Sequence, residues 1–283
     1  MVPIDYLALR LIRRWLPAPV MRFLMRQRWF VRPGLETSAP SAAVDRYQRL
    51  LHPARRDWSR STVFLLGYGG FLGVAVELLR RGAAHVVLYD PFAPLDHARN
   101  ATLLPQYTHY LLPQGDRVLP HPTFMTLLPA IDLDAALRER AVPPLDLVLS
   151  SSVYEHITAE ALERTTRTLA QHTAPTGLHL HFIDLRDHFF KYPFQMLTFS
   201  EKVWRRWLNP PSNLNRWRLK DYRALFQRHF AEVEIHILER DVTRFRQVRA
   251  RIRPEFLTRG EATDAVTQIA VVAQRPRVAN SPP

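Results

Sequence analysis

The stretch Val63-Phe64-Leu65-Leu66-Gly67-Tyr68-Gly69-Gly70-Phe71-Leu72-Gly73 joins a run of apolar residues to a turn rich in glycine. The apolar run predicts a buried strand, and residues 74–81 after the glycines predict a helix. A second apolar run at residues 85–89 predicts another strand. Strand, glycine turn, helix and strand in this order predict a βαβ unit, in which a helix joins two parallel strands.

The alternation of strands and helices continues toward the C-terminus. Apolar runs predict further strands at residues 124–128, 145–150, 177–185, 233–238 and 267–273. Residues 133–140, 158–171 and 219–230 have helical composition. This order predicts one α/β domain at residues 61–276, with a mostly parallel sheet covered by helices on both faces. An inserted segment is expected at about residues 186–218, and a disordered tail at 277–283.

Residues 1–35 form a separate, basic unit. Its apolar residues recur at helical spacing and its arginines fall on the other side: Ile4, Leu7, Leu11, Ile12 and Trp15 against Arg10, Arg13 and Arg14. This amphipathic helix either caps the domain that follows or lies on an anionic membrane surface, and we favour the cap. Residues 36–60 are expected to hold a small-residue linker at 38–43 and a leading helix at 44–51.

The composition excludes several classes of site and partner. Cysteine is absent, which rules out disulfides, thiolate metal sites and a cysteine nucleophile. The net charge of +13 is compatible with nucleic acid or an anionic membrane as a partner. However, only three of the 39 basic residues are lysines and the arginines are spread along the chain, as a GC-rich genome would produce, so we do not expect nucleic acid. No secretory signal or membrane span is readable, and the expected location is the cytoplasm, with peripheral attachment to a membrane as the alternative.

The glycine turn and Asp90 together predict a nucleoside site. A glycine turn between a buried strand and a helix lets the backbone approach a ligand, and the helix N-terminus supplies unpaired N–H donors. The second strand ends in Asp90, whose carboxylate can accept hydrogen bonds from both hydroxyls of a ribose. This pattern fits both S-adenosylmethionine and a dinucleotide, because each contains an adenosine ribose.

The choice between these two ligands depends on residues 146–157, Asp-Leu-Val-Leu-Ser-Ser-Ser-Val-Tyr-Glu-His-Ile. An Asp, apolar residues, a small polar turn and then Glu-His opening a helix resemble the fourth strand of class I S-adenosylmethionine-dependent methyltransferases. The resemblance covers residues 62–273. A closer likeness, to a bacterial subgroup of these enzymes with small-molecule substrates, lies in residues 67–73, 183–188 and 215–218.

The resemblance implies a Rossmann-like, seven-stranded, mostly parallel sheet with an antiparallel last strand and helices on both faces, here preceded by an N-terminal helical extension. It also implies S-adenosyl-L-methionine as the cofactor. The residues expected to bind the cofactor are Gly67, Gly69, Gly70, Gly73, Asp90, Asp132, Ser151 and Ser152. Asp132 has a second interpretation, as the cap of the helix that follows it.

One position departs from the family pattern. The family usually has Glu or Asp two residues before the first loop glycine, where this chain has Leu65. That acid helps to hold the amino end of the cofactor. Leu65 therefore favours an alternative in which the chain keeps the fold as a non-catalytic binding or scaffold protein.

Candidates for the chemistry follow the fourth and fifth strands. A hydroxyl or protonated nitrogen acceptor benefits from a general base, for which histidine has the appropriate pKa. The catalytic candidates are His188, His156 and Asp187, and the substrate-binding candidates are His181, Asp184, Arg186 and Tyr192. His156 has a second interpretation as a structural residue of its turn, and Asp184 and Arg186 as a local salt bridge. No metal site is expected, because the His179 and His181 pair has no third ligand at suitable spacing.

The sequence thus predicts an enzyme that transfers a methyl group, by in-line displacement, to a small-molecule or lipid- or sugar-linked acceptor. The non-catalytic alternative follows from Leu65. An RNA methyltransferase ranks lowest, because the charge alone favours it.

Overall fold

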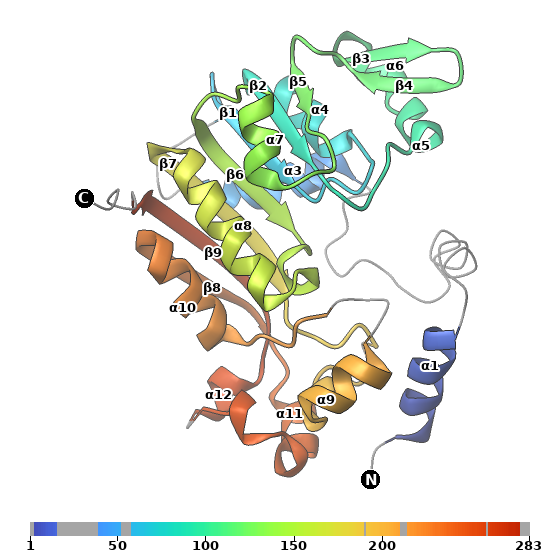
Figure 1. Ribbon diagram of the computed structural model, residues 1–283, viewed down its shortest axis with the longest axis vertical. Coiled ribbons are helices and arrows are strands. Elements are labelled where there is room, and N and C mark those ends of the chain that lie inside the picture. Colours follow the sequence, from blue (N-terminus) through green and yellow to red (C-terminus); the bar gives the residue numbers. More distant parts are fainter. Residues whose placement is uncertain are drawn as a thin grey trace.

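Seven strands of the described residues form one sheet. The computed structural model describes residues 3–15, 39–51, 58–189, 191–209, 214–258 and 260–277. The strands are β1 (Thr62–Leu66), β2 (His85–Tyr89), β5 (Met125–Leu127), β6 (Leu145–Ser151), β7 (Thr173–Asp184), β8 (Phe230–Arg240) and β9 (Val266–Pro276). Their order is β5-β2-β1-β6-β7-β9-β8 (Figure 1). Strand β9 is antiparallel to β7 and β8, and the remaining pairs are parallel, which confirms the predicted fold class.

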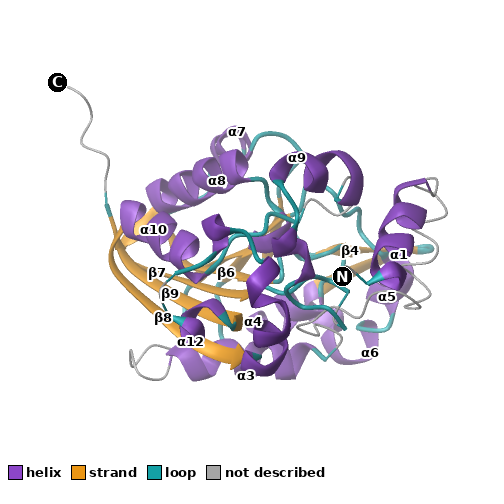
Figure 2. Ribbon diagram, turned by 90° about the horizontal axis from the view of Figure 1, so that it is seen from below, coloured by secondary structure: helices purple, strands orange, loops and turns teal. Residues whose placement is uncertain are grey.

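Helices cover both faces of the sheet (Figures 1 and 2). One face packs against α3 (Pro40–Leu51) and α4 (Gly73–Arg80), and the other against α7 (Leu133–Glu139), α8 (Ala159–His172) and α10 (Leu219–His229). In β1, Val63 and Leu65 belong to the first core, whereas Phe64 and Leu66 belong to the second. Because successive side chains of a strand point to opposite faces, a strand buried on both sides reads as a continuous apolar run.

Several boundaries differ from the sequence prediction. Helix α3 begins at Pro40, so residues 40–43 are helical and not a linker, consistent with the preference of proline for the first helical position. Glu155 and His156 lie in a short 3-10 turn, Tyr154–His156, and α8 opens only after Thr158, whose hydroxyl caps it. Between β2 and β5 the sequence predicts no helix or strand. The structure has α5 (His97–Ala101), α6 (Leu104–Tyr107) and a hairpin of β3 (Leu111–Gln114) and β4 (Arg117–Pro120) there.

The inserted segment builds a third, smaller core. It contains α9 (Glu201–Val203) and a π-helical turn, Trp204–Leu208, and packs with α11 (Val242–Val248) near α12 (Glu261–Asp264). Trp204 is buried within this core, whereas Trp207 is 43% exposed.

Helix α1 (Ile4–Trp15) docks on the inserted segment through its polar side. Tyr6 and Arg10 are buried, and both donate hydrogen bonds to the buried carboxylate of Asp187. The Arg10 guanidinium lies 4.7 Å from the ring centre of Phe189 and 4.6 Å from the ring of Trp204. The remaining residues of the 1–35 unit, and the tail beyond residue 277, lie outside the described part of the chain.

Part of the apolar side of α1 faces away from the domain. Ile4 is 78% exposed, Leu11 40% and Ile12 56%, whereas Leu7 packs against the third core. The sequence predicts the helical period of this segment correctly. An ion pair and cation–π contacts attach the polar side of the helix to the domain, and the choice between a cap and a membrane-surface segment stays a prediction.

We expect Arg10→Ala to lower the free energy of unfolding by about 3–5 kcal/mol, because it leaves the buried Asp187 carboxylate without its cation. Urea denaturation would measure the loss. The matched control is Lys191→Ala, which removes an exposed ion pair with Asp5 at the same interface and should cost at most about 1 kcal/mol. Equal losses for the two variants would contradict this account of how α1 is attached.

Candidate functional site

The predicted cofactor loop lies where β1, β2 and β6 end. Because these strands are parallel neighbours, their carboxyl ends meet at one edge of the sheet. The Gly67 N–H donates to the carbonyl of Tyr89 at 2.8 Å, and the Gly69 N–H donates to Asp90 Oδ2 at 3.0 Å. The loop is therefore hydrogen-bonded directly to Asp90, the acid that follows β2.

Gly69 and Gly70 both adopt the left-handed conformation, with φ of +63° and +75°. A Cβ at Gly70 would lie 2.2 Å from the Pro94 carbonyl oxygen, whereas one at Gly69 would meet no atom within 4 Å. Gly67 is left-handed as well, with φ of +73°, and a Cβ there would overlap Val153, while one at Gly73 would overlap Phe71. Of these four loop glycines, only Gly69 has open space beside it, and it lines the cavity described below.

The Asp90 carboxylate organises this loop. Its Oδ1 accepts the N–H groups of Phe92 at 3.0 Å and Ala93 at 3.1 Å, and its Oδ2 accepts the N–H of Gly69. A carboxylate offers roughly four acceptor positions. Three are thus used by the backbone, and about one remains for a ligand hydroxyl, where the resemblance implies two ribose contacts.

A cavity of about 150 Å³ opens beside the loop. Its lining comes from the loop, from α3 and from the end of β6: Ala43, Tyr47, Leu65, Leu66, Gly67, Tyr68, Gly69, Phe71, Val74, Arg99, Ser151 and Ser152. The Ser151 hydroxyl is buried there and has no hydrogen-bond partner among the described residues. The cavity is smaller than a typical small-molecule pocket of roughly 300–1,000 Å³. Helix α3 closes one side of it, with Tyr47 packed against Phe182 at a ring separation of 5.2 Å.

Leu65 gives one wall of this cavity an apolar character. It is buried in the same core as Tyr47 and Val74, and all three line the cavity. None of the described lining residues is acidic. The loop, Asp90 and the Ser151 hydroxyl supply polar groups of the kind that a nucleoside would need, but the lining residues offer no carboxylate to an amino group.

Asp132 caps α7. Its Oδ1 accepts the N–H groups of Asp134 at 3.1 Å and Ala135 at 3.3 Å, and the residue is exposed and outside the cavity lining. Its second interpretation, a helix cap, thus describes its contacts. Its expected contact with the cofactor stays a prediction.

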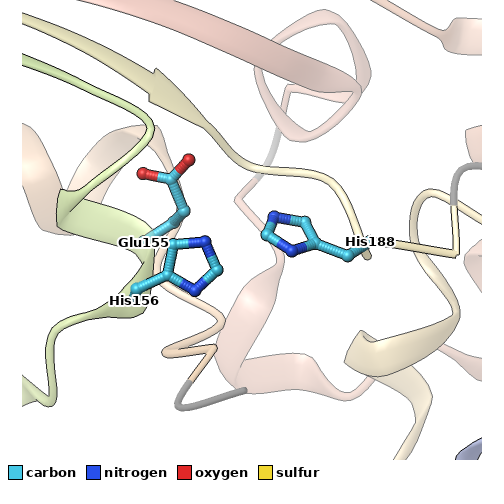
Figure 3. Close-up of side chains that lie close together, drawn as sticks. All are labelled: Glu155, His156 and His188. Carbon is cyan, nitrogen blue, oxygen red and sulfur yellow. The ribbon is translucent and has the colours of Figure 1, made fainter. Parts of the chain in front are cut away.

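Glu155, His156 and His188 come together at the same edge of the sheet. Glu155 and His156 follow β6, and His188 follows the neighbouring parallel strand β7. The two imidazole rings are 4.7 Å apart, and Figure 3 shows them turned toward each other beside the Glu155 carboxylate. Burial, together with the nearby Asp184 carboxylate, raises the pKa of Glu155 to about 8. The sequence predicts each histidine as a separate candidate, although their positions after adjacent parallel strands also indicate that they lie close together.

Asn215 holds the Glu155-His156 turn in place. Its backbone N–H donates to the carbonyl of Glu155 at 2.9 Å, and its side-chain amide donates to the carbonyls of Tyr154 and Ile157 at 2.7 and 2.8 Å. Arg218 is buried and donates to the carbonyl of Leu185 at 2.6 Å, just after β7 ends. The motif at residues 215–218 therefore supports both segments that carry the cluster, a role the sequence alone did not reveal.

His181 lies in the core, on the face of β7 that α8 and α10 cover. It is fully buried, its Nδ1 is 2.8 Å from the Ser150 hydroxyl, and its ring packs against Tyr154 and Phe226. Burial lowers the pKa of His181 to about 3, so the ring is neutral at physiological pH. The structure does not bring it to the cavity lining.

The other predicted substrate residues have partners within the fold. Asp184 is buried and pairs with Arg186 at 2.7 Å, as the salt-bridge interpretation predicts. Tyr192 donates to the Asp5 carboxylate of α1 at 2.7 Å. Asp187 accepts the Phe189 N–H at 3.1 Å besides its bonds from α1, so it fixes the loop that carries His188.

Comparison with known proteins finds similarity in the fold. No protein-family model matches the sequence, and no curated protein matches it. Among solved structures, an S-adenosylmethionine-dependent methyltransferase from Mesorhizobium loti is 17% identical with a TM-score of 0.44, over 81% of this chain and 96% of that one. Magnesium protoporphyrin IX methyltransferase from Synechocystis PCC 6803 with bound SAH is 13% identical with a TM-score of 0.47, over 85% of both chains. These similar structures are S-adenosylmethionine-dependent methyltransferases, and the similarity concerns the fold alone.

The two glycines in the loop should respond differently to alanine. We expect Gly69→Ala to lower the free energy of unfolding by about 1–2 kcal/mol, the usual cost of a left-handed alanine. Gly70→Ala should cost about 2–5 kcal/mol, because the overlap of its Cβ with the Pro94 oxygen adds to that strain. Urea denaturation of both variants tests this, and equal losses would argue against the described loop conformation.

Proposed function

We propose that this protein is an S-adenosylmethionine-dependent methyltransferase acting on a small-molecule or lipid- or sugar-linked acceptor. The observation that carries the proposal is the contact between the Gly69 N–H and Asp90, which joins a glycine loop to a ribose-binding acid beside a cavity at the carboxyl edge of the sheet. The unpartnered Ser151 hydroxyl in that cavity supports a polar ligand. When bound, the cofactor would supply an activated methyl group.

The residues of this chain would contribute positioning and proton transfer. Gly69 and Asp90 would orient the nucleoside, and Ser151 and Ser152, at the end of β6, would line the path to the reacting atoms. His156 and His188 lie beyond them at the same edge and would take the proton from a hydroxyl or nitrogen acceptor. Asp187 would act as a positioning residue, because its bonds to Tyr6, Arg10 and Phe189 hold the loop before His188.

Calorimetry tests cofactor binding directly. We expect S-adenosylmethionine or its demethylated product to bind at millimolar concentration or tighter, and Asp90→Asn to weaken binding roughly ten- to a hundred-fold, the cost of losing a charged hydrogen bond. Asp116→Ala, which removes an exposed acid in the β3–β4 turn, is the control and should bind as the wild type does. Absence of binding for both ligands would end the proposal.

A second candidate function, a non-catalytic binding or scaffold protein, is favoured by Leu65 and by the small cavity. It predicts normal folding without methyl transfer. Incubation with a radiolabelled methyl donor and lysate from the source organism separates the two functions, since a labelled product dependent on this protein excludes the second. An RNA methyltransferase remains the least favoured, because only the net charge of +13 supports it.

We also propose that α1 lies on an anionic membrane surface. Its apolar side, formed by Ile4, Leu11 and Ile12, is exposed while its polar side is attached to the domain, an orientation that leaves apolar side chains free to enter a lipid interface. The positive charge of the chain adds attraction to anionic lipids. In the described part of the chain, no helix has the length and apolarity needed to cross a bilayer, so this contact would be peripheral.

Flotation with phosphatidylglycerol-containing vesicles tests this contact. The triple variant Ile4→Ser, Leu11→Ser, Ile12→Ser should lose roughly ten-fold or more of its vesicle-bound fraction, because the apolar contribution to interfacial binding is removed. Leu238→Ser, at a residue 45% exposed on β8, is the matched control and should float with the wild type. Equal flotation of the triple variant and the wild type would exclude α1 as the contact.

A further inference from the structure

Glu155, His156 and His188 have the composition of a metal site. One carboxylate oxygen and two imidazole nitrogens can be chosen from them that all lie within 4.8 Å of one another (Figure 3). A carboxylate with two imidazoles suits divalent transition-metal ions such as Zn²⁺ and Mn²⁺, rather than Ca²⁺ or Mg²⁺, which prefer oxygen ligands.

The three ligand atoms lie somewhat farther apart than they would around a bound ion. In tetrahedral coordination, ligand atoms at about 2.0–2.2 Å from an ion lie roughly 3.3–3.6 Å from one another. Separations of up to 4.8 Å would therefore close by at most roughly 1.5 Å on binding. His156 and His188 are only partly buried, which leaves their side chains room to move toward an ion.

The Glu155 carboxylate independently indicates a missing partner. The residue is 2% exposed, and its Oε2 is buried without a hydrogen-bond partner among the described residues. Its Oε1 accepts a long bond from the Asp184 N–H, at 3.4 Å. A buried carboxylate with an unpaired oxygen is costly, and buried charges in proteins are normally paired or coordinate a metal.

The surrounding structure fixes both segments that carry these side chains. Asn215 clamps the turn of Glu155 and His156 through three hydrogen bonds. Asp187, held by Tyr6 and Arg10, fixes the backbone next to His188. Such support around a set of ligands is typical of built metal sites, in which outer residues orient the inner ones.

We propose that Glu155, His156 and His188 bind one divalent transition-metal ion, with its remaining coordination positions open to a ligand. The cluster adjoins the cofactor loop, since Val153, two residues before Glu155, packs against Gly67. An ion here would hold and polarise an oxygen of the acceptor, a role that rests on the proposed methyltransferase function. Metal binding itself does not depend on that function.

Titration of the metal-free, full-length protein with Co²⁺, followed by absorption spectroscopy, and with Zn²⁺, followed by calorimetry, tests the site. We expect one ion per chain and at least a ten-fold weaker affinity for both His156→Ala and His188→Ala. Because His188 is only partly buried, His188→Asn gives a second variant if the alanine form does not fold. The control is His236→Ala, which removes a histidine paired with Glu234 on the surface and should leave binding unchanged.

The outcomes separate this inference from the proposed function. Absence of a bound ion, or equal affinity in wild type and both histidine variants, overturns the metal site even if the cofactor binds. Loss of the ion in His156→Ala and His188→Ala, with retention in His236→Ala, establishes the site even if neither S-adenosylmethionine nor its demethylated product binds.

Discussion

Parallel strands end at the same edge of a sheet, and four neighbouring strands of this protein, β1, β2, β6 and β7, do so. Four parts of the candidate site follow these ends: the glycine loop after β1, Asp90 after β2, Glu155 after β6 and His188 after β7. Residues far apart in the sequence therefore become neighbours without any long-range signal in the sequence itself. The continuous apolar burial of the strands fixes this geometry.

The site has two parts with different polarity. Beside the glycine loop, Leu65, Tyr47 and Val74 form an apolar wall, and the cavity is small. Beyond Val153, the Glu155 carboxylate lies close to two imidazoles. One of its oxygens is buried without a hydrogen-bond partner among the described residues, an arrangement that a bound cation would stabilise. The chain thus has Leu65 where the resemblance implies an acid for the amino end of a cofactor, and gathers the proposed metal ligands beyond Val153.

The N-terminal helix links this site to a surface. Asp187 accepts hydrogen bonds from Tyr6 and Arg10, so the loop that carries His188 is braced by α1. A buried arginine is stabilised there by a carboxylate and by aromatic rings, and this attachment directs Ile4, Leu11 and Ile12 outward. Contact of that apolar side with a membrane would therefore act on a helix that directly supports the candidate site.

The sequence by itself determined the α/β class, the mostly parallel sheet, the glycine loop and its acid, because each depends on local periodicity or on a short motif. It also predicted the helical period of residues 4–15. Only the tertiary structure decided which side of α1 is buried, that Asp132 caps a helix, that His181 belongs to the core, and that His156 and His188 meet. These outcomes depend on contacts between segments distant in the chain, and hydrophobic periodicity carries no information about where a buried ion pair attaches a helix or which loops converge at a sheet edge.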